Sequence, residues 1–330
     1  MPMHPARTAW LAALTACVPK YSALPAITPA ELHAPLPVAH VDVTLEDGAV
    51  VDVAMIDSWG GADSGPGADL PPLVLVHGLS SYMGFWEYQV TELAQDRRVL
   101  ALDLPGYGAS ARPDAPYTPP WYAEVVVRWL DEIGVEQAVL VGHSMGGQIS
   151  MTIALDHPER VERLVLAAPA GIETFDAGAA DWMKAFWHEA RATHAREEEL
   201  RATFSTLVFN RMDDGVERLL EERVRMAGTP AFRGTSVAVS RSVAGMLDHP
   251  VAHRLPDISV PTLLIFGTQD RMIPNAVFTG GRTRSVAEAG RDAIPHAGLV
   301  MLPGAGHTVQ HDDPDGFNAA VRSFLAAPLR

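Results

Sequence analysis

The residues best suited to chemistry are a serine, an aspartate and a histidine that lie far apart in the chain. Ser144 is the central residue of the G-x-S-x-G sequence Gly142–Gly146, which follows the apolar run 138–141 and precedes a helical pattern. A sharp turn between a strand and a helix needs small flanking residues, and it exposes the serine hydroxyl at the start of the helix. A dinucleotide-binding turn would need G-x-G-x-x-G, which is absent here. The motif therefore predicts that Ser144 is a nucleophile.

A serine hydroxyl needs a general base near neutral pH. His307 follows the glycine-rich segment Pro303–Gly306, directly after the last apolar run of the chain. A loop at the C-terminal end of a strand reaches the edge of the sheet where Ser144 is expected. His311 is expected to face solvent or to cap the next helix. We therefore predict that His307 is the base.

The base in turn needs a carboxylate that fixes its tautomer and favours the imidazolium. Asp270 directly follows the apolar run 262–266 and the short link Gly267–Gln269, so it lies at the C-terminal end of another expected strand. Asp103 also ends a strand, but it precedes Ser144 and begins a sequence typical of a structural turn. The order serine, aspartate, histidine favours Asp270 as the acid. The alternatives are Asp103, Asp248 and Asp257.

Acyl transfer also needs N–H groups that stabilise a developing oxyanion. One candidate is the amide of Met145, directly after the nucleophile. The other is the amide of Leu79, in the loop that follows the apolar run 73–76. Gly78 permits the unusual backbone that would turn the Leu79 amide inward. We expect these two amides to form an oxyanion hole.

Apolar runs and helical patterns alternate along most of the chain, which predicts an α/β fold with a mostly parallel, twisted sheet and helices on both faces. A β-hairpin comes first, over 41–45 and 50–56. The expected strands that follow are 73–76, 98–102, 138–141, 161–167, 262–266 and 298–302. The expected helices are 85–94, 119–133, 145–156, 276–289 and 317–325, the last capped by Asp313 and Pro314.

The alternation stops between 171 and 256, where the composition is mostly helical. We therefore expect a core made of 38–170 and 257–330 with a helical insertion at 171–256. The insertion leaves the sheet after a strand, so it is expected to lie over the ligand-binding edge.

Taken together, these motifs resemble the α/β-hydrolase superfamily, in particular its serine esterase and C–C hydrolase branch. The resemblance rests on His77-Gly78, Asp103–Ser110, Gly142–Gly147, Gly267–Asp270 and Gly306-His307, and it covers roughly 38 to 325. It implies that the insertion is a lid. The serine at position 144 disfavours the dehalogenases and epoxide hydrolases that resemble this family, because those enzymes have an aspartate at this position. The loop after His77 also lacks the H-G-G-P-G and H-G-G-G patterns of two sister groups.

Aromatic residues of the insertion are candidates for an acyl pocket, although ordinary packing of the lid helices explains them equally well. They are Trp182, Phe186 and Trp187, with Phe204 and Phe209 as further members. An apolar lid favours an apolar or medium-chain acyl group.

The first 37 residues combine a signal-like segment with a proline-rich tether, and we expect them to add little to the core. Cys17, the single cysteine of the chain, directly follows Leu14-Thr15-Ala16, which resembles the lipobox of bacterial lipoproteins. This predicts lipidation at Cys17 and a membrane-anchored or exported protein, with a cytoplasmic location as the alternative. An incidental cysteine in a disordered or helical tail is the other interpretation.

The composition limits the possible functions. With 48% apolar residues the chain can build a large core. Its net charge of −15 disfavours general binding to nucleic acids, because phosphate backbones repel such a surface. One cysteine excludes an internal disulfide and a cysteine-based metal site. We predict a serine hydrolase for small carboxylic esters that needs no metal or organic cofactor. Hydrolysis of a C–C bond in a ring-cleavage dione, acyl transfer and a non-enzymatic binding role are the alternatives.

Overall fold

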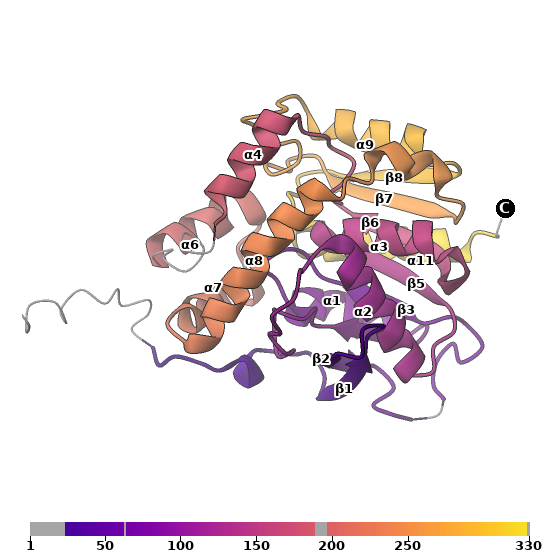
Figure 1. The fold of residues 1–330 in the computed structure, drawn as a ribbon. Helices are drawn as coiled ribbons and strands as arrows, with labels where there is room; N and C mark the ends of the chain where they lie inside the picture. Colours follow the sequence, from indigo (N-terminus) through magenta and orange to yellow (C-terminus); the bar gives the residue numbers. More distant parts are fainter. Residues whose placement is uncertain (1–23, 63, 189–196, 329–330) are drawn as a thin grey trace, which may run out of the picture.

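The computed structural model describes residues 24–328, except residue 63 and residues 189–196. Its centre is an eight-stranded sheet with the order β1-β2-β4-β3-β5-β6-β7-β8 (Figure 1). β1 pairs with β2, and β2 with β4, in antiparallel fashion, and the remaining neighbours are parallel. The strands are β1 (Val38–Thr44), β2 (Val50–Asp57), β3 (Leu73–Val76), β4 (Val99–Leu102), β5 (Ala138–His143), β6 (Val161–Ala167), β7 (Thr262–Gly267) and β8 (Ala297–Leu302).

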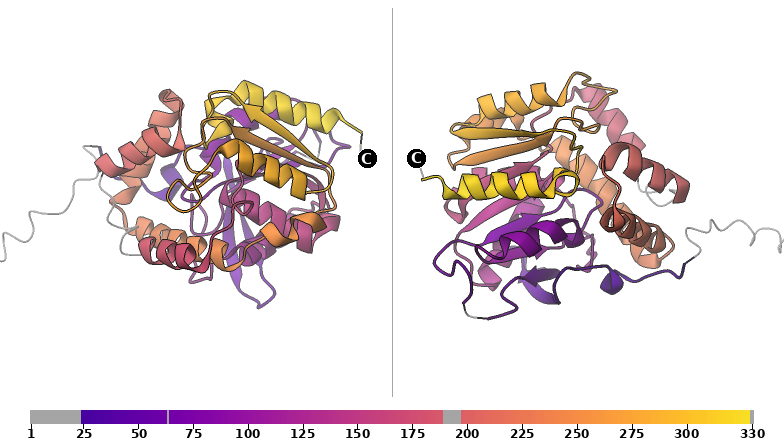
Figure 2. Two further views of the ribbon diagram at one scale, coloured as in Figure 1. Left: turned by 90° about the horizontal axis from the view of Figure 1, so that it is seen from above. Right: turned by 180° about the vertical axis from the view of Figure 1, so that it is seen from behind.

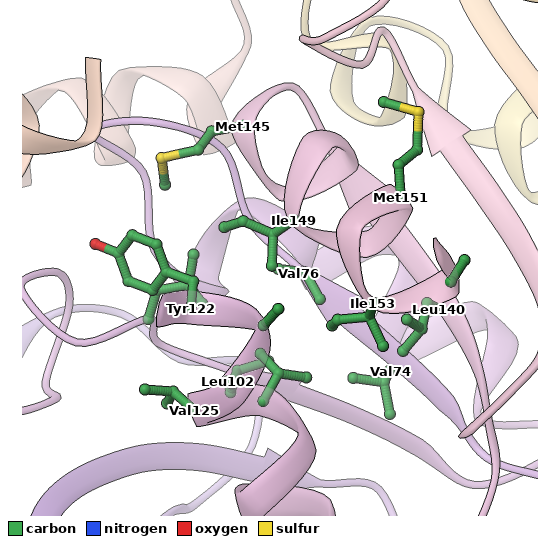
Figure 3. Packing of buried hydrophobic residues seen from close by; sticks show 14 of the residues in the cluster. Val74, Val76, Leu102, Tyr122, Val125, Leu140, Met145, Ile149, Met151 and Ile153 are labelled. Atoms are coloured by element: carbon green, nitrogen blue, oxygen red, sulfur yellow. The ribbon is translucent and has the colours of Figure 1, made fainter. Parts of the chain in front are cut away.

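Helices cover both faces of this sheet, because its central strands are apolar on both sides. In β3, Val74 and Val76 belong to one hydrophobic cluster, and Leu73 and Leu75 belong to the other. Figure 3 shows the first cluster, in which Ile149 and Ile153 of one helix approach Val74 and Val76. The first face carries α2 (Pro119–Glu132), α3 (Met145–Asp156) and α9 (Thr283–Ala293), and the second carries α1 (Glu87–Leu93) and α11 (Pro314–Ala326).

The chain reverses its direction of travel across the sheet at β3. It moves from β3 to β4 on one side and then returns to β5 on the other. Open α/β sheets bind ligands where the strand order reverses, beyond the carboxyl ends of the strands. The loop after β3 and the turn after β5 therefore meet at one place, and these are the segments that carry Leu79 and Ser144.

The segment between β6 and β7 is helical in the residues that are described. Most of its helices lie together beyond one end of the sheet, as all three ribbon views show (Figures 1 and 2). They are α4 (Ala177–Phe186), α6 (Glu197–Thr203), a π-helical turn η5 (Phe204–Val208), α7 (Asp214–Ala227) and α8 (Pro230–Asp248). The 3-10 helix η6 (Ala252–Asp257) leads back to β7 and contacts α9, and its Arg254 pairs with Asp156 of α3 at 2.8 Å. Short helices also occur at η2 (Pro29–Glu31), η3 (Met83–Trp86), η4 (Pro158–Arg160) and α10 (Val309–Asp312).

Two expectations from the sequence were wrong in detail. The helix expected at 276–289 begins only at Thr283, because the preceding residues form a turn in which Gly280 and Gly281 have φ angles of 62° and 90°. Residues up to 37 were expected to add little to the core, yet in the described part Ile27 is 4% exposed. Leu32, Ala34 and Leu36 also pack against the core.

Candidate active site

Ser144 lies at the tip of the turn between β5 and α3. Its backbone has φ 51° and ψ −116°, a conformation that costs energy for a residue with a side chain. The flanking glycines make the turn possible. A Cβ atom on Gly142 would lie 2.4 Å from the carbonyl oxygen of Gly146, and one on Gly146 would lie 2.2 Å from that of Val76. The turn can therefore form only with glycine at both positions.

An unbroken chain of hydrogen bonds joins the three residues that the sequence predicted. His307 Nε2 lies 3.0 Å from Ser144 Oγ, and His307 Nδ1 lies 2.9 Å from Asp270 Oδ2. The three side chains come from the loops after β5, β8 and β7. His307 is 3% exposed, so little water competes for these bonds. The arrangement can transfer the Ser144 proton to His307 while the carboxylate holds the imidazole in the required tautomer.

Asp270 is held by its own loop. Its Oδ1 atom accepts hydrogen bonds from the backbone N–H groups of Met272 at 2.7 Å and Ile273 at 3.0 Å. These bonds occupy one carboxylate oxygen and leave Oδ2 for His307. The loop therefore orients the carboxylate of Asp270 toward the imidazole of His307.

His143, next to the nucleophile in sequence, lies beside His307. The two ring centroids are 5.0 Å apart, and His143 Nε2 lies 3.1 Å from the carbonyl oxygen of His307. Burial holds the pKa of His143 well below its usual range, so its ring is neutral at neutral pH. It therefore fixes the backbone of His307 without placing a like charge beside it.

Two backbone amides are available near the Ser144 hydroxyl. Within the described part of the chain, neither Leu79 N–H nor Met145 N–H donates to a protein acceptor. A Cβ atom on Gly78 would lie 3.2 Å from Ser144 Cβ, so the loop after β3 passes directly over the nucleophile. Free N–H groups at a helix start and in an adjoining loop can stabilise an oxyanion.

His77 fixes the loop that carries Leu79 through two hydrogen bonds. Its Nε2 atom accepts a hydrogen bond from Leu104 N–H at 2.9 Å, and its Nδ1 atom donates to the carbonyl of Gly78 at 2.8 Å. Burial lowers the pKa of His77 to about 4, which keeps the ring neutral and compatible with both bonds.

With this geometry established, comparison with known proteins gives a consistent result. Residues 71–314 match the sequence profile described as alpha/beta hydrolase fold. The chain belongs to the α/β-hydrolase fold family. It is an enzyme of the α/β-hydrolase class, and the fold and the family resemblance expected from the sequence are confirmed.

Individual relatives of this hydrolase are named for different activities. The chain is 33% identical to a 2-hydroxymuconate semialdehyde hydrolase of Pseudomonas sp. (strain CF600), over 80% of this chain and 89% of that one. It is 26% identical to a probable 1-acylglycerol-3-phosphate O-acyltransferase of Oryza sativa subsp. japonica, over 78% and 68%. A solved structure of a probable hydrolytic enzyme from Pseudomonas aeruginosa PAO1 superimposes with a TM-score of 0.81 at 26% identity, over 93% and 100%.

Sequence reasoning missed Asp312 of the hydrolase, which supports the loop of His307. One oxygen accepts a hydrogen bond from Gly306 N–H at 2.7 Å, and the other accepts from Asn210 at 2.9 Å and Arg211 at 2.8 Å. The carboxylate thus joins the residue before His307 to the helical insertion. No local sequence signal could have found the link to the insertion, because Asn210 and Arg211 lie about a hundred residues away from Asp312.

Two of the three alternatives for the acid, Asp103 and Asp248, have structural roles. Asp103 accepts hydrogen bonds from Met83 N–H at 2.6 Å and Ala109 N–H at 2.7 Å, which hold its turn closed. Burial raises the pKa of Asp103 to about 6. Asp248 pairs with Lys184 at 2.7 Å, on the insertion.

His311 does not face solvent, contrary to the expectation. It is 1% exposed, and its ring contacts those of Phe85, Tyr88 and Phe209 at centroid distances of 6.0, 5.0 and 5.6 Å. The reason is that α10 packs against η3 and α1, which the sequence pattern does not reveal. Burial lowers the pKa of His311 to about 4.

The insertion aromatics separate into two groups. Trp182 and Trp187 are 51% and 38% exposed, and Trp182 stacks on Phe186 and contacts Phe278. Phe204 instead lines a narrow cavity beside the Leu79 loop, and Phe209 is buried against it. Other residues of this cavity are Ser80, Ser81, Phe85, Tyr107, Leu219, Arg223 and Met226. Of the expected pocket aromatics, only Phe204 and its neighbour lie near the candidate oxyanion amides.

The described residues contain no group of three or more His, Cys, Asp or Glu side chains placed to hold a metal ion. None of their helices combines the length and the apolar character needed to cross a bilayer. Cys17 lies outside the described residues, so its predicted lipidation stays a prediction.

Proposed function

We propose that this hydrolase cleaves carboxylic esters through an acyl-enzyme on Ser144. The observation that carries the proposal is the unbroken hydrogen-bond chain from Ser144 through His307 to Asp270. Two amides without protein acceptors, those of Leu79 and Met145, support it because they supply the second component that acyl transfer needs.

The reaction then has two stages. His307 removes the Ser144 proton as Oγ attacks the ester carbonyl, and the tetrahedral oxyanion is stabilised by the Leu79 and Met145 amides. The intermediate collapses when His307 protonates the leaving alcohol. A water molecule activated by His307 then attacks the acyl-enzyme, releases the carboxylic acid and restores the serine. The proton that leaves Ser144 goes to the alcohol, and the proton that leaves water goes back to Ser144, so the cycle closes without a cofactor.

The helical insertion would act as a lid over this site. Its residues Asn210 and Arg211 bind Asp312 beside the His307 loop, and Phe204 lines the cavity near Leu79. The aromatic residues that the insertion contributes, Trp182, Trp187 and Phe204, favour an apolar acyl group. A membrane tether through Cys17 stays part of the proposal, and metabolic labelling with a fatty acid would test it, with Cys17→Ser as the unlabelled control.

Hydrolysis of a C–C bond in a ring-cleavage dione is the second candidate. The relative named 2-hydroxymuconate semialdehyde hydrolase favours it, because that protein is 33% identical over most of both chains. The same three side chains and two amides could serve both reactions, so the substrate decides between them. Acyl transfer to an alcohol is a third outcome, which the relative named as an O-acyltransferase brings into consideration.

The deciding experiment begins with intact mass after reaction with a fluorophosphonate. We expect one adduct on the wild-type chain and none on Ser144→Ala. An ester series and a vinylogous dione would then be compared, with an added alcohol as acyl acceptor and identification of the products. Acid and alcohol products support the ester proposal. Turnover of the dione alone supports C–C hydrolysis, a new ester supports transfer, and a folded wild-type chain without an adduct contradicts all three.

A further inference from the structure

The loop that carries the Leu79 amide contains a strained residue. Ser80 has a φ angle of 61°, in the left-handed region that disfavours residues with a side chain. It occupies the third position of a turn that is closed by a hydrogen bond from Ser81 N–H to the carbonyl of Gly78 at 3.3 Å. A positive φ angle at this position of a turn is usually supplied by glycine or asparagine. Some contact outside the turn must therefore hold Ser80 in place.

Arg223 provides this contact from the helical insertion. Its guanidinium, on α7, donates a hydrogen bond to Ser80 Oγ at 2.6 Å. The same guanidinium lies over the ring of Phe232 on α8, 4.6 Å from the centroid, which fixes its direction. Residues of two helices of the insertion thus orient the guanidinium of Arg223 toward the turn.

The Arg223 cation has no competing partner in the described part of the chain. No carboxylate there forms an ion pair with it. Burial lowers the pKa of Arg223 to about 10, so the side chain is still charged at neutral pH and donates strongly. Arg225, two residues further along α7, differs: it bonds the carbonyl of Pro25 and pairs with Glu221, away from the loop.

We propose that Arg223 is a positioning residue that holds the Ser80 turn, and with it the Leu79 amide, in the geometry that stabilises the oxyanion. The inference rests on the proposed acyl transfer at Ser144. It makes the position of the insertion a requirement for acylation, because the cation that restrains the turn belongs to the insertion. Loss of the contact allows the turn to relax, and the amide then moves away from the position that the oxyanion occupies.

The test compares four variants by the rate of fluorophosphonate reaction and by kcat and KM for an ester. Arg223→Met keeps the chain length but removes the donor, and we expect about a 10-fold loss in kcat and in labelling rate, with little change in KM. Ser80→Ala removes the acceptor and should lose a similar factor. The double variant should lose no more than either single one, because both remove the same contact. Arg225→Met is the matched control and should keep the wild-type rate.

Rescue distinguishes positioning from a general effect on folding. Glycine adopts a positive φ angle without strain. Ser80→Gly combined with Arg223→Met should therefore recover most of the lost labelling rate, although it restores no contact to α7. Melting temperatures of all variants would show whether the fold is intact.

Three results would overturn the proposal. One is an unchanged labelling rate in a folded Arg223→Met chain. Another is an increase in KM alone, which would mean that Arg223 contacts the substrate instead. The third is a failure of Ser80→Gly to rescue Arg223→Met. A wild-type chain that does not label at Ser144 contradicts the proposed function itself, and so the two failures are distinguishable.

Discussion

The carboxylate of Asp312 accepts the backbone N–H of Gly306 at 2.7 Å, and Gly306 directly precedes His307 in the chain. The other oxygen of the same carboxylate binds the insertion through the N–H groups of Asn210 and Arg211. One acidic side chain therefore positions the candidate base and attaches the insertion to it.

Replacement of Asp312 tests this link. Asp312→Asn places an amide donor where at least one backbone N–H needs an acceptor. A buried donor without an acceptor costs about 1–3 kcal/mol. We therefore expect about a 10-fold lower kcat and a lower melting temperature. Asp315→Asn, on the exposed face of α11, is the control. Wild-type kcat in the Asp312 variant would mean that the His307 loop holds its position unaided.

Asp270→Asn should leave the fold intact and remove most of the activity. The amide nitrogen can replace Oδ2 and favour the tautomer with the proton on Nε2, which cannot accept the proton of Ser144. By analogy with enzymes of known Ser-His-Asp mechanism we expect a loss on the order of 10³–10⁴ in kcat. Steady-state kinetics beside a melting curve measures it. Activity within a few-fold of wild type would transfer the role of the acid to another residue.

Gly146→Ala should prevent the turn at Ser144 from forming. The added Cβ would lie 2.2 Å from the carbonyl oxygen of Val76, and neither backbone segment can move away within the sheet and helix. We expect loss of fluorophosphonate labelling and a destabilisation of several kcal/mol, on the order of other overpacked or strained core sites. The control is Gly298→Ala, whose nearest atom would be 3.4 Å away. Equal labelling of the two variants would contradict the close approach at Gly146.

Acid should destabilise the fold through His311. The pKa of this ring is about 4 in the folded chain and about 6.5 when it is unfolded. Between these values the unfolded chain binds a proton that the folded chain does not, so the free energy of unfolding falls as the pH falls, by at most about 3 kcal/mol at pH 4. His77 acts in the same direction, whereas the raised pKa of Asp103 acts against it.

A single variant isolates the contribution of His311. Gln carries no charge at any of these pH values, so His311→Gln should flatten the dependence of the melting temperature on pH between 6.5 and 4. His157→Gln, whose wild-type side chain is 42% exposed, should leave the slope unchanged. An identical slope in wild type and His311→Gln would assign the acid sensitivity to other groups.

Removal of the residues before β1 should destabilise the insertion. Ile27 is 4% exposed, His33 N–H binds Glu222 at 3.0 Å, and Arg225 binds the carbonyl of Pro25 at 2.7 Å. Burial of an isoleucine alone contributes about 1.5–3 kcal/mol. A chain that starts at Val38 should therefore have a lower melting temperature than one that starts at Leu24, which keeps these contacts. Equal melting temperatures would restore the view that this segment is only a tether.

Local sequence determined the parts of the protein whose physical causes are local. Alternating apolar runs predicted the strands, because a strand covered on both faces must be apolar throughout. The turn at Ser144 was predictable because its geometry tolerates only glycine at 142 and 146. The chain order of Ser144, Asp270 and His307, each after a strand, was enough to place them at one edge of a parallel sheet.

The tertiary structure decided what depends on residues distant in sequence. His311 is buried against aromatic residues of other elements, Asp312 binds Asn210 and Arg211, and Arg223 binds Ser80. Each of these contacts joins segments whose proximity no local pattern encodes. The same reason explains why Trp182 could not be separated from Phe204 by residue type. Both are aromatic residues of helical segments, and only the packing of the insertion on the sheet makes one exposed and places the other beside the candidate site.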